Sequence, residues 1–254
     1  MITRLSVIAM VTLCAASACV QAAPAPAMPD VSRLLPDIAG GSASSMLMWV
    51  ALVTVMSVAP AILILLTSFT RIIVVLGLLR QALATQQTPP NQVLFGLALL
   101  MTVVVMAPVY KNVDRDALTP YLAGQSDRQQ ALAAASGHVR EFMIRQIEQA
   151  NNTQDVYLFL KDEAARKDKL TWSDVPTPSL LSAFVVSELK TAFTIGFRIF
   201  LPFVIIDMLV ASVLLSMGMF MLPPVLVSLP LKLLLFVLAD GWHLVVDTLM
   251  QSFN

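Results

Sequence analysis

Long apolar segments separated by short polar ones dominate most of the chain. Met46–Leu66 contains no charged residue and is long enough to cross a bilayer, which takes roughly 20 apolar residues in a helix. Gln92–Val109 is a second segment of this kind, and residues 180–254 hold two more. The pattern predicts an all-α polytopic membrane protein with about four long hydrophobic helices, paired in two helical hairpins at 46–110 and 180–254.

The N-terminal residues 1–22 have the pattern of a secretory signal peptide. Arg4 precedes an apolar run, Leu5–Val20, and small residues lead up to Ala22. We expect cleavage after Ala22, with a retained signal anchor as the alternative. Residues 23–45 are rich in Ala, Pro, Gly and Ser and are predicted to be a linker.

Residues 111–179 are strongly polar, with nine basic and ten acidic residues, and contain helix-like stretches near 128–151 and 155–169. A signal peptide followed by two spans places both the mature N-terminus and this helical region on the periplasmic side. The connection between the first two spans contains Arg71 and Arg80 and no acidic residue. The positive-inside rule therefore predicts that these two arginines lie on the cytoplasmic side.

Composition narrows the class of function. Hydrophobic residues make up 57% of the chain and the formal net charge is zero, so a nucleic-acid partner is not expected. Both cysteines, Cys14 and Cys19, lie in the predicted signal peptide. The two histidines, His138 and His243, lie in different regions and fit no metal-ligand spacing. We expect neither an enzyme nor a cofactor.

Charged residues in the second hairpin are the exception to its apolar character. A charge at the centre of a membrane helix costs about 2.5–3.5 kcal/mol on insertion scales, so these side chains are expected to meet partners or water. Their signs roughly balance, which favours ion pairs, and Glu188 with Lys232 is the predicted pair, either within one chain or between neighbours. Charges that extend to the bilayer surface are the alternative for some of them. The five residues are Glu188, Lys190, Arg198, Asp207 and Lys232.

The turn of this hairpin, Met217–Pro224, lacks polar side chains. Methionines and a phenylalanine on a glycine hinge, closed by two prolines, would form a soft apolar gate, because methionine is flexible and apolar constrictions exclude ions by dewetting. Gap filling in tight helix packing is the alternative. The gate residues would be Met219, Phe220 and Met221, and the hinge residues Met217, Gly218, Pro223 and Pro224.

Several long motifs resemble the FliP family of flagellar biosynthesis proteins, subunits of type III secretion export gates, over about Trp49 to Phe253. They are Pro60–Ile72, Leu78–Leu83, Thr88–Val93, Ala183–Phe193, Asp207 with Val210–Leu214, Leu229–Leu233 and Phe236–Trp242. The resemblance implies a subunit of the flagellar export gate in the inner membrane, at the flagellar basal body. Several copies would assemble with FliQ and FliR into a helical oligomeric channel for unfolded flagellar subunits, near FlhB and FlhA and in contact with membrane lipid.

The resemblance also implies roles for single residues. The family carries three consecutive methionines as a gasket at the hairpin tip, which correspond to Met219, Phe220 and Met221. Glu188 and Lys232 fall on Ser-Glu-Leu and Pro-x-Lys-Leu motifs, which supports their pairing. The resemblance further implies that the hairpins can be lifted toward the periplasm in the assembly. The alternatives are the homologous subunit of a virulence injectisome, and an independent ion channel or transporter.

Overall fold

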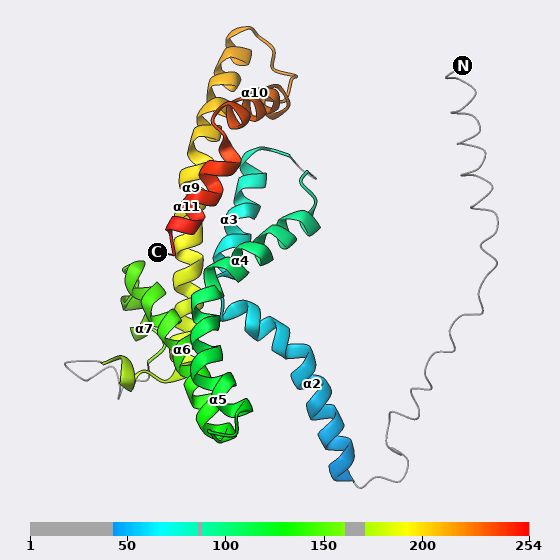
Figure 1. Cartoon of the computed structure of the whole chain (residues 1–254). Coiled ribbons are helices and arrows are strands. Elements are labelled where there is room, and N and C mark those ends of the chain that lie inside the picture. The colour runs from blue at the N-terminus through cyan, green and yellow to red at the C-terminus, as the bar shows by residue number, and fades with distance from the viewer. Residues whose placement is uncertain (1–42, 86–87, 161–170, 254) are drawn as a thin grey trace, which may run out of the picture. The chain divides into compact units, whose positions relative to one another are not determined.

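The structure, a computed structural model, describes residues 43–85, 88–160 and 171–253 (Figure 1). The predicted signal peptide and most of the predicted linker lie outside the described residues. The chain divides into two compact units, Met1–Ser57 and Val58–Asn254. Every regular element of the described residues is a helix, which confirms the predicted all-α fold.

Helix α2 (Ala43–Leu65) begins inside the segment predicted to be a linker. Its composition is apolar on all sides, and the side chains of residues 46–58 are exposed except for the half-buried Trp49. Met48 is 77% exposed and Met56 is 68% exposed. A helix of this kind needs lipid or another protein around it, because its own unit does not cover it.

The segment predicted to connect the first two spans is itself a helix, α3 (Phe69–Ala82). The structure thus places a further helix between the two helices of the hairpin predicted over residues 46–110. Residues Phe69, Ile72, Leu76 and Leu79 follow each other at intervals of three or four, which places them on one face of α3, and all four are buried. This face packs against α4 (Asn91–Val113) and α9 (Thr177–Ser216).

A glycine allows α3 and α9 to approach closely. A Cβ atom at Gly196 in α9 would lie 2.2 Å from Cδ1 of Leu78 in α3. Any larger residue at this position would force Leu78 away, so Gly196 determines the spacing of the two helices.

Helix α4 runs through Pro108 and continues beyond the predicted end of the second span. The predicted helical stretch near 128–151 is confirmed as α6, whereas residues 161–170 of the second stretch lie outside the described residues. The polar region contains a π-helix at Asp114–Leu118, α5 (Thr119–Leu122), α6 (Arg128–Gln149), α7 (Gln154–Tyr157) and a 3₁₀ turn at Trp172–Asp174.

The second hairpin consists of α9, α10 (Pro224–Leu238) and α11 (Gly241–Gln251). The chain bends by 65° between α10 and α11, so the second arm is broken where one helix was predicted. Two helical stretches of the described residues, Asn91–Leu122 and Thr177–Ser216, are long and apolar enough to span a membrane, and α10 with α11 can form a third span. Four spans are not confirmed.

Two hydrophobic cores lie along α9. The first surrounds α3 and takes in side chains from α4, α9, α10 and α11. The second lies between α6 and the beginning of α9, with Phe142 and Phe184 in edge contact at a centroid distance of 6.0 Å. Buried charged and polar side chains lie where these two cores meet.

Candidate functional site

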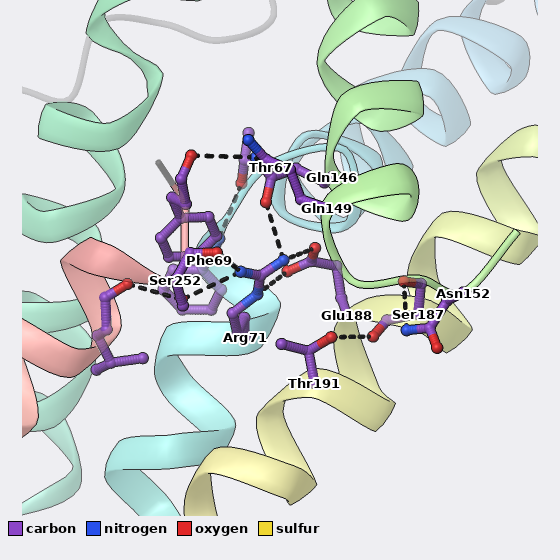
Figure 2. Close-up of polar contacts among 12 residues, drawn as sticks. Thr67, Phe69, Arg71, Gln146, Gln149, Asn152, Ser187, Glu188, Thr191 and Ser252 are labelled. Carbon is purple, nitrogen blue, oxygen red and sulfur yellow. Dashed lines mark hydrogen bonds and ion pairs between the residues drawn. The ribbon is translucent and has the colours of Figure 1, made fainter.

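The guanidinium group of Arg71 lies at the centre of a polar cluster that joins four parts of the chain (Figure 2). Arg71 was predicted to lie in a cytoplasmic connection, but it lies on α3 and is only 1% exposed. Its Nε and Nη2 atoms donate to the two carboxylate oxygens of Glu188 on α9, at 2.9 and 2.5 Å. This bidentate pair is the strongest geometry available between an arginine and a carboxylate.

The remaining N–H groups of Arg71 reach two further elements. Nη2 donates to Oε1 of Gln146 on α6 at 3.0 Å. Nη1 donates to the carbonyl oxygen of Ser252 at 2.6 Å and to its hydroxyl oxygen at 3.1 Å. These five hydrogen bonds match the five N–H groups of a guanidinium, so the buried charge is fully satisfied.

An aromatic ring completes the cluster. The Cζ atom of Arg71 lies 4.1 Å from the centroid of the Phe253 ring, within the range of a cation–π contact. The amide nitrogen of Gln146 points toward the carbonyl oxygen of Phe253 at 3.4 Å. The last described residues of the chain therefore form one side of the Arg71 site.

The predicted pair of Glu188 with Lys232 is wrong within the chain. Glu188 is fully buried against Arg71, and Lys232 pairs with Asp207 at 2.6 Å. Lys232 also donates to the carbonyl oxygen of Ala82 at the end of α3, at 3.2 Å. Asp207 accepts a second hydrogen bond from Ser228 at 2.5 Å. Lys232 and Asp207 therefore fasten α10 to α9 and to α3.

Two other charges of the second hairpin are not buried. The side chain of Lys190 is 55% exposed and pairs with Asp155 of α7 at 2.5 Å. Arg198 is exposed, and within the described part of the chain it forms neither an ion pair nor a hydrogen bond. The prediction that Lys190 and Arg198 are buried charges is wrong, because both residues are exposed to solvent.

Arg80, the second arginine of the predicted connection, lies near the end of α3 and is half-buried. Its guanidinium group donates to Oδ1 of Asn91, the first residue of α4. The contact joins the two ends of the turn between α3 and α4. It leaves the predicted membrane side of Arg80 untested.

The tip between α9 and α10 is apolar and exposed. Gly218 has φ of 76°, which ends α9, and the N–H groups of Gly218 and Met219 donate to the carbonyls of Leu215 and Leu214. Met221 is 96% exposed and Phe220 74%. Pro223 and Pro224 then start α10, a position where proline fits because its missing N–H has no helical partner.

Sequence reasoning missed Gln146, Ser252 and Phe253 as partners of Arg71. The sequence does indicate α3, because Phe69, Ile72 and Leu76 have the spacing of an amphipathic helix. A positive charge on the buried face of such a helix needs an acceptor. No sequence pattern indicates which residues accept hydrogen bonds from Arg71. They are separated from Arg71 by 75 to 181 positions.

The fold and the site define an all-helical protein whose apolar helices are consistent with a membrane location and whose buried charges hold its own helices together. The model of the FliP family matches residues 52–249. The chain is 52% identical to the flagellar biosynthetic protein FliP of Bacillus subtilis over 211 residues, which cover 83% of this chain and 93% of the relative. The chain therefore belongs to the FliP family, and it is a flagellar biosynthesis protein of the export apparatus.

Two further relatives give the same result. The FliP protein of Caulobacter vibrioides is 48% identical over 205 residues, with 81% of this chain and 75% of the relative covered. That of Pectobacterium carotovorum is 47% identical over 224 residues, with 88% and 84% covered. The family match, residues 52–249, includes Arg71, Gln146, Glu188 and the hairpin tip, whereas Ser252 and Phe253 lie outside it.

Proposed function

We propose that this chain is a channel-forming subunit of the flagellar type III export gate. Several copies assemble with FliQ and FliR around a channel for unfolded flagellar subunits, in contact with FlhB and FlhA. The assembly lies in the inner membrane at the flagellar basal body, with the mature N-terminus and residues 111–179 on the periplasmic side. The chain acts by binding and gating and not by catalysis.

The exposed apolar tip is the observation that carries this proposal. Met219, Phe220 and Met221 are 38%, 74% and 96% exposed, although such side chains are normally withdrawn from water. A ring of these tips contributed by several subunits would leave an apolar constriction with no hydration sites for ions. Methionine side chains can change rotamer around a passing polypeptide, whereas the stiffer Phe220 ring limits that adaptation.

Replacing Met219, Phe220 and Met221 together by alanine tests the gate. We expect the assembled complex to form and to conduct ions in planar-bilayer recordings, because three shorter side chains per subunit widen the constriction. The matched control replaces Leu122 and Leu132 by alanine, since these are 75% and 70% exposed but lie in the polar region. A triple variant that stays as ion-tight as the control contradicts the gating role.

Assembly is supported by the apolar surface of the second hairpin. Exposed apolar side chains cover the second half of α9 and the outer face of α10, among them Met208 at 68% and Val237 at 73%. Such a surface is too apolar for water and is suited to lipid or to neighbouring subunits.

Native mass spectrometry of the chain in mild detergent tests assembly, with and without co-expressed FliQ and FliR. We expect a discrete oligomer that gains both smaller subunits, because the exposed apolar faces then become interfaces. A chain with no partners added serves as the reference. A monomer in both samples contradicts the proposal and favours an independent transporter.

The buried charges give no support to an independent ion pathway. Glu188 and Lys232 are satisfied by Arg71 and Asp207, so neither is free to bind a transported ion. The relatives named above are flagellar proteins, which favours the flagellar pathway over a virulence injectisome.

A further inference from the structure

The residues that follow α11 contact the Arg71 site directly. Ser252 and Phe253 follow α11, and the N–H of Ser252 donates to the carbonyl oxygens of Thr248 and Leu249, at 3.1 and 3.2 Å. This last tight turn points the carbonyl oxygen of Ser252 at Nη1 of Arg71, at 2.6 Å. The geometry directs a main-chain acceptor and an aromatic ring into the same polar cluster.

The apolar face of α11 ends at this site. Val245, Leu249 and Phe253 are spaced four residues apart and are 4%, 0% and 9% exposed. They lie in the core around α3, so Phe253 is both the last member of an apolar stripe and the ring above the Arg71 guanidinium. Packing and polar contacts therefore converge on one residue at the end of the chain.

Arg71 depends on the end of the chain in return. Two of its five hydrogen bonds go to Ser252, and they are the only partners of Nη1 in the described residues. When Ser252 and Phe253 move away, Nη1 is left without an acceptor inside the core, and a buried charge without a partner is unfavourable.

There is space into which the end of the chain can move. A cavity of about 450 Å³ lies between α4, α6 and the C-terminal end, and Phe253, Met250 and Val105 are part of its wall. Phe253 thus packs in the core on one side and borders open space on the other.

We propose that Ser252 and Phe253 form a C-terminal latch, with the side chains of Arg71, Gln146 and Glu188 as its receptor. The latch holds α11 against α3 and α6, while Lys232 independently holds α10. With the latch open, α10 and the tip stay in place and α11 detaches. The chain presents the α11 surface in one fixed position only when the latch is closed.

Hydrogen exchange of the full-length chain in detergent, with no tag after Asn254, tests the latch. We expect Phe253→Ala to speed exchange of the amides of α11 by about tenfold, because local opening controls their exchange. Phe253→Leu should have a smaller effect, since leucine keeps the apolar contact and loses the ring. Gln251→Ala is the matched control: Gln251 is the neighbouring exposed residue and bonds only to Asp247 in the described residues. Equal protection of α11 in the Phe253→Ala and Gln251→Ala chains overturns the latch.

A second variant tests the receptor. Arg71→Met should speed exchange of α11 in the same way, and adding Phe253→Ala to it should have little further effect, because both changes break one contact. Independent effects of the two changes would show that Phe253 acts by apolar packing alone, and would overturn the assigned receptor. If Arg71→Met does not give folded protein, the Phe253 and Gln251 variants decide. A single purified chain suffices for these measurements, so their result is separate from that of the proposed channel.

Discussion

A guanidinium group fits the position of Arg71 in a way that an ammonium group cannot. The acceptors around it come from three residues: the carboxylate of Glu188, the amide of Gln146, and the two oxygens of Ser252. A planar fork of five donors meets all of them at once, whereas a lysine has three donors at the end of a flexible stem. The face of the guanidinium plane is also free to lie on the Phe253 ring.

Arg71→Lys is therefore expected to destabilise the chain although the charge is kept. We expect a loss of about 3–6 kcal/mol in the free energy of unfolding, because hydrogen bonds to charged groups contribute about 1.5–3 kcal/mol each and two acceptors lose their donor. Denaturant titration in detergent micelles measures the change. Arg198→Lys is the control, since Arg198 is exposed. Equal unfolding midpoints for the two variants would contradict the assigned hydrogen-bond geometry.

The sequence indicates that Glu188 and Lys232 need counter-charges, but it does not indicate which residues supply them. Lys232 and Glu188 lie in apolar segments, so burial with a counter-charge could be predicted from insertion energetics. Which counter-charge each one meets depends on helix packing. Hydropathy places Arg71 in a connection outside the apolar segments. Lys232, which lies in the other arm of the hairpin, is therefore the partner that the sequence suggests for Glu188.

At the level of elements, the junction between α10 and α11 is set by two residues. Asp240 adopts a left-handed conformation with φ of 49°, which ends α10 and turns the chain. Gly241 follows, and a Cβ atom there would lie 2.2 Å from the ring of Phe236, which is buried in the core. The bend therefore requires a residue without a side chain at position 241.

A pair of glycine substitutions tests this reading of the junction. Gly241→Ala is expected to lower the free energy of unfolding by about 1–3 kcal/mol, because the Phe236 ring must leave its packed position. Gly137→Ala in α6 has open space around the added methyl group and is expected to stabilise the chain by about 0.4–1 kcal/mol. Thermal unfolding of both variants in the same detergent shows whether each substitution lowers or raises the stability. A stabilising Gly241→Ala would contradict the close contact.

The apolar pattern predicts most of the helices, but it does not predict where one helix ends and the next begins. The segment Phe69–Ala82 has the spacing of a buried helix, yet its two arginines and its place between two longer apolar segments indicated a connection. The break at Asp240 and Gly241 lies inside a continuous apolar stretch, where hydropathy carries no signal for a bend. The apolar tip, in contrast, lies where the Gly-Pro-Pro pattern predicted it, and it is exposed.

At the level of the second unit, the two halves of α9 differ in how far the rest of the chain buries them. The first half of α9 contributes most of its buried residues, among them Phe184, Glu188 and Ala192. The second half contributes Phe203 and Leu214 and otherwise exposes apolar side chains. One half of the helix is thus largely covered by its own chain, and the other half is mostly exposed.

The length of α9 has a consequence for its surroundings. Its 40 residues make a helix roughly 60 Å long at about 1.5 Å per residue. The hydrocarbon layer of a bilayer is about 30 Å thick, so a helix near the membrane normal can place only about half of α9 in lipid. The half that its own chain leaves uncovered is of that length. Either that half crosses the hydrocarbon layer, or neighbouring protein must replace lipid along it, because its exposed apolar side chains are unfavourable in water.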